Sequence, residues 1–348
     1  MRGQTTPAAR RARWWMPGLS AVAVAALVAT GLTGTAQAAY QGLDGLIAFV
    51  RNGNIYTINP ESTTPGSTVV RLTRDGHDSG PRWSPSGKRL AYLDRGNLWI
   101  MNANGSHKKR LTDQAPAYTD ARPSWSPDGR YLAFVKTKKG KGFGYLTRYD
   151  TVTHKLVTFS TPSHSEQPTK RQIKVTALPA AVAWAWARDA TGVTFGSFII
   201  FEGATAPRCP SSRFCLDALG FGSQAYYRNG FASAEDLTKK PVRLLDPDWY
   251  PISPLFSVNA LTTQEKCAAS TCTHTGIDLT IGASPILSGG YQAVYSPTGN
   301  FVAYVKNVRG KPGIFIWSRP GIVPIPTRKL TAGTEPDWQP VPVPPPPT

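Results

Sequence analysis

The sequence predicts an all-β protein built from a repeated unit of four short strands. Residues that form turns and residues that favour strands are both abundant, with 32 Gly and 31 Pro beside 10 Trp, 13 Tyr and 13 Phe among 348 residues. This mixture is typical of many short strands joined by turns. In addition, one motif recurs along the chain, and a period of about 40 residues indicates a repeat architecture.

An aromatic residue, a Pro-Gly turn and a short apolar run define the repeat. Trp83–Gly87 (WSPSG) precedes Leu90–Tyr92 (LAY), and Trp125–Gly129 (WSPDG) precedes Leu132–Phe134 (LAF). Proline fixes φ at the second turn position, and glycine adopts a positive φ without steric cost. The aromatic anchors of the six repeats are Trp83, Trp125, Trp186, Trp249, Tyr295 and Trp338.

Each repeat reads as four strands, A to D. In the repeat of Trp83, strand A ends at this residue, strand B is Leu90–Tyr92, strand C is Leu98–Met101 and strand D ends at Thr112. The B strands are apolar without alternation, which indicates strands buried on both faces. We therefore expect each sheet to pack between two neighbouring sheets.

The two ends of the chain complement each other. Residues 46–73 supply strands B, C and D without a strand A, whereas Trp338 belongs to a strand A that no further strand follows. Joined together, they complete a sixth sheet and leave no free edge. The fold class is therefore a six-bladed β-propeller of four-stranded antiparallel blades, closed by N- and C-terminal strands that share the last blade.

The order Leu-Thr, spacer, Pro-x-Trp-Ser-Pro-Asp-Gly, Leu-Ala-Phe resembles the TolB-like six-bladed propellers with WD40-like repeats, in a secreted bacterial form. The resemblance covers about residues 45–340 and is most specific at Trp83, Trp125 and Tyr295. It implies a periplasmic or extracellular propeller that binds proteins or ligands at one face or in the central channel. It carries no universal set of catalytic residues.

The first residues read as an export signal. Arg2, Arg10, Arg11 and Arg13 precede an apolar run that ends in Ala36-Gln37-Ala38, the order of a secretory signal peptide. We expect a signal peptide at 1–38, cleaved after about Ala38, a propeller at 39–340 and a Pro-rich tail at 341–348. Alternatives are an uncleaved membrane anchor and a twin-arginine signal. The chain would then be secreted, either extracellular or associated with the cell wall, without a transmembrane segment.

The chain carries a net charge of +18. Its basic surface suggests an acidic protein or an anionic cell-envelope polymer as partner; a generic soluble surface is the alternative. We expect a monomer without a cofactor. A specific nucleic-acid partner is not expected, because the Trp residues are accounted for as anchors rather than as a stacking platform.

Four cysteines suit two local disulfides in an exported protein. Cys209 with Cys215 and Cys267 with Cys272 are the expected pairs, although the sequence allows three connectivities. A zinc site is the alternative, but the spacings differ from the usual C-x2-C pattern.

Sequence expansions concentrate in the B–C and D–A connections, which lie on one face of a propeller. The expanded segments are 136–142, 160–180, 202–223 and 262–275. Insertions on one face often mark the binding face, although surface loops also tolerate neutral insertion. Candidate ligand-binding residues on this face are Asp75, His77, Asp78, Tyr118, Asp120, Arg122, Glu335 and the lysines Lys136, Lys138, Lys139 and Lys141.

Motifs of known catalytic sites are absent from the sequence. It contains no G-x-S-x-G, H-E-x-x-H, P-loop or helix-opening G-x-G-x-x-G. The five histidines show no metal-ligand spacing. The sequence therefore favours a secreted propeller that binds a protein or polymer through its long-loop face and central channel. A hydrolase or lactonase with a metal in the channel, and a structural spacer at the cell surface, remain alternatives.

Overall fold

The computed structural model describes residues 42–62, 68–113, 115–121, 123–141, 143–160, 287–318 and 326–343, together with the strand backbones between 172 and 278. The predicted signal segment 1–38 and residues 344–348 lie outside this part. All regular secondary structure within it is β-strand. These residues thus include no helix able to cross a bilayer.

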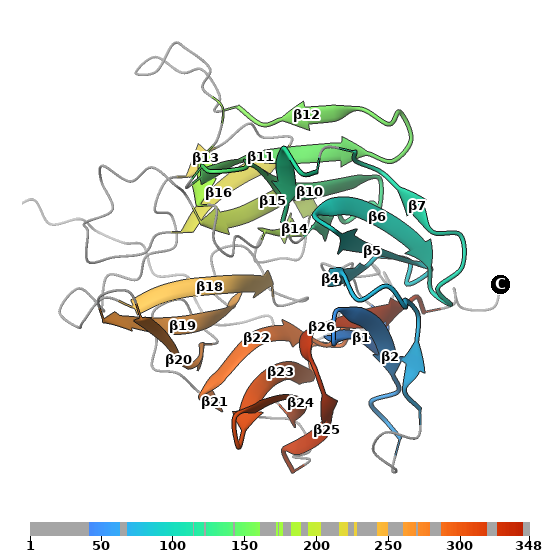
Figure 1. Ribbon diagram of the computed structural model, residues 1–348, viewed down its shortest axis with the longest axis vertical. Helices are drawn as coiled ribbons and strands as arrows, with labels where there is room; N and C mark the ends of the chain where they lie inside the picture. The colour runs from blue at the N-terminus through green and yellow to red at the C-terminus, as the bar shows by residue number, and fades with distance from the viewer. Residues whose placement is uncertain are drawn as a thin grey trace, which may run out of the picture. The chain divides into compact units, whose positions relative to one another are not determined.

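The described strands form six antiparallel sheets, which we name by one strand of each (Figure 1). The β1 and β4 sheets have four strands each, in the predicted order. The β1 sheet contains β26 (Thr334–Val341), β1 (Leu43–Arg51), β2 (Asn54–Ile58) and β3 (Val70–Arg71), and the β4 sheet contains β4 (Asp78–Trp83), β5 (Arg89–Asp94), β6 (Asn97–Asn102) and β7 (Lys109–Arg110).

Three further sheets repeat this order. They are the β14 sheet with β14 (Val182–Arg188), β15 (Thr194–Glu202), β16 (Leu216–Phe221) and β17 (Tyr226–Tyr227), the β18 sheet with β18 (Val242–Trp249), β19 (Ala260–Ala268), β20 (Thr271–Asp278) and β21 (Leu287–Ser288), and the β22 sheet with β22 (Gly290–Tyr295), β23 (Phe301–Val308), β24 (Lys311–Ser318) and β25 (Arg328–Ala332). The segment 262–275, expected as a long loop, is largely strand, since β19 and β20 form a hairpin with Ala268 opposite Thr271.

The β10 sheet departs from the pattern because its first strand is interrupted and a sixth strand is added. Strands β8 and β9 both pair with β10, and both β12 and β13 pair with β11. Its strands are β8 (Tyr118–Asp120), β9 (Ser124–Trp125), β10 (Tyr131–Lys138), β11 (Phe143–Asp150), β12 (Leu156–Thr158) and β13 (Lys174–Thr176).

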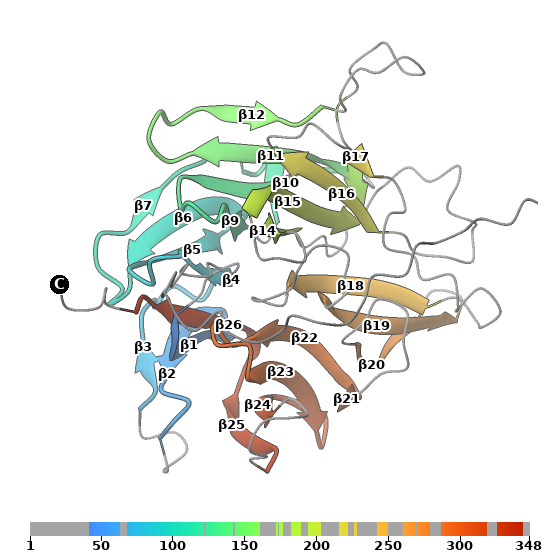
Figure 2. The ribbon, with the colours of Figure 1, turned by 180° about the vertical axis from the view of Figure 1, so that it is seen from behind.

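The predicted closure of the chain ends is confirmed. Strand β26 pairs antiparallel with β1, with Trp338 opposite Ile47 and Val341 opposite Leu43. Figures 1 and 2 show the C-terminal strand lying beside the N-terminal one. The pairing leaves β1 hydrogen-bonded on both sides, to β26 and to β2, so the N-terminal strand has no free edge.

Each Ser-Pro-x-Gly turn is held by its own serine. Ser84 and Ser126 accept hydrogen bonds from the backbone N–H of the first residue of the next strand, Arg89 at 3.1 Å and Tyr131 at 2.8 Å. Gly87 takes a φ of 66° in this turn, a conformation that glycine adopts without steric cost. The motif therefore recurs because it closes the A–B hairpin.

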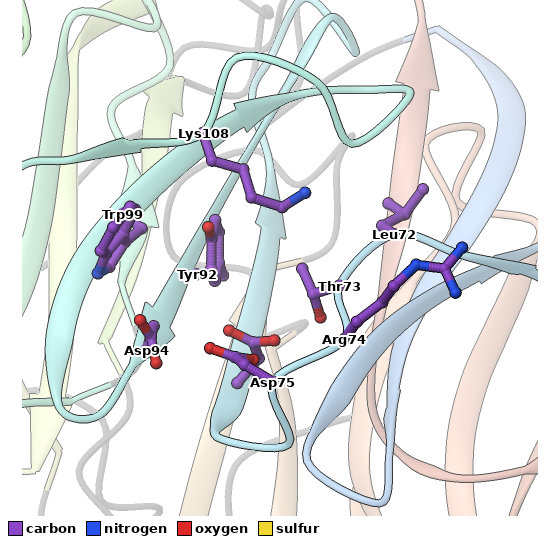
Figure 3. Close-up of a pocket in the computed structure, with 9 residues that line it drawn as sticks. Leu72, Thr73, Arg74, Asp75, Tyr92, Asp94, Trp99 and Lys108 are labelled. Carbon is purple, nitrogen blue, oxygen red and sulfur yellow. The ribbon is translucent and has the colours of Figure 1, made fainter.

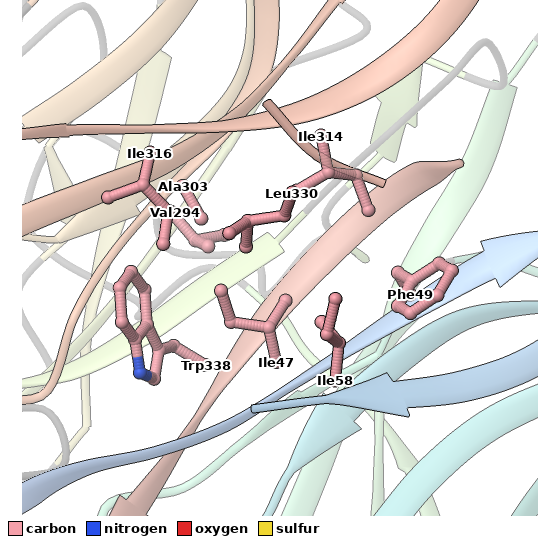
Figure 4. Packing of buried hydrophobic residues seen from close by; sticks show 9 residues of the cluster. All are labelled: Ile47, Phe49, Ile58, Val294, Ala303, Ile314, Ile316, Leu330 and Trp338. Carbon is pink, nitrogen blue, oxygen red and sulfur yellow. The ribbon is translucent and has the colours of Figure 1, made fainter. Parts of the chain in front are cut away.

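The hydrophobic cores lie between neighbouring sheets. Ile47 and Phe49 of β1 pack against the β22 sheet, whereas Ala48 packs against the β4 sheet (Figure 4). The B strands are thus buried on both faces, as predicted. Trp338 is 5% exposed and joins the β1 sheet to the β22 sheet. Truncating such a residue to Ala costs about 3–5 kcal/mol.

Candidate functional site

Two copies of the Leu-Thr motif lie where one sheet leads into the next. Leu72-Thr73 connects the β1 sheet to the β4 sheet, and Leu111-Thr112 connects the β4 sheet to the β10 sheet. Thr112 accepts a hydrogen bond from the Leu98 backbone N–H at 2.8 Å and donates to Asp120 Oδ2 at 2.5 Å. Thr73 accepts the corresponding bond from Ile55 at 2.8 Å. The sequence marked this motif only as a repeat signal. In the structure, its hydroxyl joins strand C of one sheet to the first strand of the next.

Asp78 and Asp120 occupy equivalent positions at these junctions. The backbone N–H of Asp78 donates to the carbonyl of Gly53 at 2.7 Å, and that of Asp120 donates to the carbonyl of Gly96 at 2.8 Å. Both carbonyls belong to a B–C turn of the preceding sheet. The predicted proximity of the D–A and B–C connections is therefore confirmed at two junctions, and we call this surface the loop face.

Three carboxylates meet at the first junction. Asp78 lies directly opposite Asp94 in the β4–β5 pairing, and Asp75 joins them from the preceding loop. One oxygen atom of each lies within 4.8 Å of one oxygen of each of the others. Asp94 was not among the sequence candidates. Only the cross-strand register reveals its place, because in the sequence it is an ordinary residue before the Arg95-Gly96 turn.

A pocket of about 430 Å³ opens beside the aspartates. Its lining includes Thr73, Tyr92 and Lys108 in addition to the carboxylates. Figure 3 shows Asp75 and Asp94 at one end of this pocket and Lys108 at the other side of the Tyr92 ring. The pocket lies between the loop that leaves the β1 sheet and strands β4 to β6.

Burial makes Asp78 the least acidic of the three. Asp78 is only 3% exposed. Desolvation, followed by a hydrogen bond and charge repulsion from Asp75 and repulsion from Asp94, raises its pKa to about 7 despite a hydrogen bond with Thr73. Its Oδ2 is buried and has no hydrogen-bond partner.

The pKa values of the other two carboxyls shift in opposite directions. Desolvation and then repulsion from Asp75 raise the pKa of Asp94. Desolvation also acts on Asp75, but hydrogen bonds from Asp78 and from the His77 backbone outweigh it, so the pKa of Asp75 is lowered. Arg95 Nη1 approaches Asp94 at 3.2 Å and Asp75 at 3.5 Å from the solvent side.

The second junction carries a lysine where the first carries Asp94. Lys136 lies opposite Asp120 in the β8–β10 pairing, and its Nζ is 4.5 Å from the centre of the Tyr118 ring. Desolvation raises the pKa of Asp120 to about 6, while the Thr112 hydroxyl and the Lys136 charge lower it. Asp120 is 4% exposed, and its Oδ1 is buried without a partner.

The four predicted lysines separate into two groups. Lys136 is half-buried against Tyr118, whereas Lys138, Lys139 and Lys141 are exposed at the end of the β10–β11 hairpin. Lys138 lies opposite Tyr118, so the hairpin end belongs to the loop face. Only these three lysines form the exposed basic patch that the sequence suggested, and we call them the lysine hairpin.

Glu335 joins neighbouring inner strands. Its Oε2 accepts a hydrogen bond from the Gly80 backbone N–H at 2.6 Å, and its own N–H donates to Gln292 Oε1 at 3.0 Å. It thus links β4, β26 and β22. His77 is exposed, and its backbone supports Asp75.

The remaining predicted residues are only partly described. Arg122, Cys209 and Cys215 lie outside the described residues. The backbones of Cys267 and Cys272 lie directly opposite each other in the β19–β20 pairing. Residues opposite each other in an antiparallel pair have Cα atoms about 4.5–5.5 Å apart, a separation that a disulfide spans. The two disulfides stay predictions.

Comparisons with known proteins agree with this architecture. No protein-family model and no curated protein sequence matches the chain. Among solved structures, TolB from Acinetobacter baumannii is similar with a TM-score of 0.54 and 15% identity, over 85% of this chain and 67% of that one. A chain of a nidogen/laminin complex is similar with a TM-score of 0.52 and 9% identity, over 86% and 99%. At such identities the likeness concerns the fold alone, and the chain has a TolB-like β-propeller fold.

Proposed function

We propose that this propeller is a secreted binding module that holds an anionic macromolecule on its loop face. The observation that carries the proposal is the lysine hairpin: Lys138, Lys139 and Lys141 are all exposed at the end of one hairpin of that face. The net charge of +18, which becomes +14 when the four arginines of residues 1–38 are removed, provides a long-range attraction for the same class of ligand. An anionic cell-envelope polymer is the ligand to test first.

Several weak contacts must act together in such a site. An exposed ion pair contributes about 0–1 kcal/mol, so three lysines give useful affinity only to a ligand with closely spaced charges. Because these lysines are exposed, salt screens their charges effectively. We therefore expect binding that weakens steeply as the salt concentration rises.

Sedimentation with purified cell walls at low and high salt tests the proposal. Replacing Lys138, Lys139 and Lys141 together with Ser should reduce the bound fraction several-fold at low salt. The control replaces three exposed lysines at the A–B and C–D ends of the sheets, Lys88, Lys109 and Lys155. Both variants lose the same charge, so only a site on the loop face distinguishes them.

The control set follows from the structure. Arg89 stacks on Trp125, with its guanidinium carbon 5.0 Å from the ring centre, and Lys108 lines the aspartate pocket, so neither serves as a neutral control. Equal loss of binding in both triple variants, or binding that salt does not affect, would refute the lysine hairpin as the binding surface.

Export and disulfides complete the proposal. Residues 1–38 would be removed on secretion, and N-terminal sequencing of protein from a culture medium should begin near Ala39. Peptide mapping without reduction should recover Cys267 joined to Cys272 and Cys209 joined to Cys215. A mature protein that retains residues 1–38, or free thiols at these positions, would contradict this part.

A further inference from the structure

We propose that Asp75, Asp78 and Asp94 bind one divalent cation, with Ca²⁺ as the ion that fits best. The site lies at the junction of the β1 and β4 sheets, where the loop before β4 meets the end of β5. It is separate from the lysine hairpin, so the inference does not depend on the proposed function.

The spacing of the carboxylate oxygens suits a single ion. Ca²⁺ takes oxygen ligands at about 2.3–2.6 Å, so two ligands on opposite sides of the ion are about 4.6–5.2 Å apart. One oxygen of each aspartate lies within 4.8 Å of the others. All three atoms can therefore belong to one coordination sphere without a backbone movement.

The unpartnered oxygen of Asp78 is a second and independent indication. Asp78 is 3% exposed and lines the pocket, and its Oδ2 is buried without a hydrogen-bond partner. Leaving a buried polar atom unpaired costs about 1–3 kcal/mol, and more for a charged group. A cation in the pocket would supply the missing partner and would offset the repulsion among the three carboxylates.

The equivalent junction shows that the fold does not need this concentration of negative charge. Asp120 has the same backbone bond and the same threonine contact as Asp78, but Lys136 lies opposite it. A lysine at that position suffices to compensate the buried carboxylate. Asp94 instead adds a second carboxylate opposite Asp78, and its ion pair with the exposed Arg95 lies on the solvent side of the cluster.

The ligand chemistry favours a hard ion. The three ligand atoms are all carboxylate oxygens, which suit Ca²⁺ or Mg²⁺ rather than zinc. Asp75 is exposed, and the pocket of about 430 Å³ leaves room for water to complete six to eight ligands. This irregular set of ligands fits the flexible coordination of Ca²⁺ better than the strict octahedron of Mg²⁺.

Titration calorimetry with CaCl₂ on the purified protein, after removal of metals with EDTA, tests the site. We expect one site per chain with a dissociation constant on the order of 10⁻⁴–10⁻³ M, a range typical of extracellular modules. Asp78→Asn and Asp94→Asn should each weaken binding at least tenfold. Asp113→Asn removes an exposed carboxylate that pairs with Arg110 outside the cluster and should bind normally.

Asp94→Lys separates cation binding from folding, because it reproduces the charge arrangement of the second junction. This variant should lose calcium binding and, in EDTA, melt at the same or a higher temperature than the unchanged protein. It should also sediment with cell walls as before, whereas the triple lysine variant should still bind calcium. Either proposal can therefore fail without the other.

Three results would overturn the cation site. The first is a lack of heat and of a melting-temperature shift at about 10 mM CaCl₂, a concentration that would fill a site of this class. The second is normal binding by Asp94→Asn. The third is an equal loss of binding in Asp113→Asn.

Discussion

The Leu-Thr junctions at Thr73 and Thr112 share a framework and differ in charge. At both, a buried aspartate donates its backbone N–H to a B–C turn of the preceding sheet. Across the strand pair, however, Asp78 meets Asp94, whereas Asp120 meets Lys136. The common part of the junction therefore joins the sheets, and the residue opposite is free to vary.

This difference separates structural from functional residues. The threonine hydroxyl and the backbone bonds satisfy the same buried groups at the Thr73 and Thr112 junctions, so they belong to the structural framework. The charge opposite the aspartate decides whether the junction is internally compensated or can accept a cation. Residues that recur between the repeats thus identify the structural framework. A residue that differs at an equivalent position, such as Asp94 in place of Lys136, identifies the candidate site.

The largest expected effect comes from breaking the common framework. Thr112→Val keeps the side-chain shape but removes the acceptor for Leu98 N–H and the donor to Asp120. Leaving these buried groups without partners should lower the free energy of unfolding by about 3 kcal/mol. Urea denaturation measures it. Thr112→Ser keeps the hydroxyl and should cost about 1 kcal/mol for the lost methyl group. Equal losses in both variants would show that the hydroxyl is not responsible.

The pH dependence of stability should come next in size. Because burial raises the pKa of Asp120 to about 6 in the folded state, the folded protein binds this proton more tightly than the unfolded chain. The free energy of unfolding should therefore fall as the pH rises from about 4 to 6, by about 2–3 kcal/mol from this group. Asp120→Asn should remove this contribution.

Comparing denaturation of the two proteins at pH 4 and pH 7 isolates this effect. Relative to the unchanged protein, Asp120→Asn should gain stability between the two pH values, whatever its absolute stability is. A parallel pH dependence in both proteins would mean that Asp120 ionises as readily in the folded state as in the unfolded chain.

Much of the fold could be predicted from the sequence, because the repeat encodes it directly. The anchors Trp83, Trp125 and Trp338 are buried between sheets, and the end strands pair as expected. Asp78 and Asp120 were also found, since they follow the Leu-Thr motif at the start of a repeat. The sequence could not show what each of them faces, because cross-strand partners depend on register.

Two of the predicted site residues have contacts that the sequence could not show. Lys136 was grouped with Lys138, Lys139 and Lys141, although it lies deeper in the sheet and stacks on Tyr118. Glu335 was assigned to ligand binding, but its carboxylate holds the Gly80 backbone of the neighbouring inner strand. In both cases a charged residue that looked free in the sequence contacts a residue brought near by the fold.

A smaller effect is expected from removing the lysine of the second junction. Lys136→Met should raise the pKa of Asp120 further, because the nearest opposite charge is lost. At pH 7 the free energy of unfolding should fall by about 1 kcal/mol, with a smaller change at pH 4. Lys138→Met serves as the control, since Lys138 is exposed two residues further along the same strand. Identical pH profiles for both variants would refute compensation by Lys136.

The smallest expected effect concerns the arginine at the rim of the aspartate cluster. Arg95 has a φ of 46° and precedes Gly96 in a two-residue turn, a position that Asn also tolerates. Arg95→Asn should therefore keep the turn while removing the positive charge that approaches Asp75 and Asp94. Because this exposed pairing is worth less than about 1 kcal/mol, calcium affinity should rise only about threefold, and less at high salt. Weaker calcium binding in this variant would mean that Arg95 orders the Asp75 loop for the ion, whereas stronger binding that salt abolishes would show that the arginine and the cation compete for the same carboxylates.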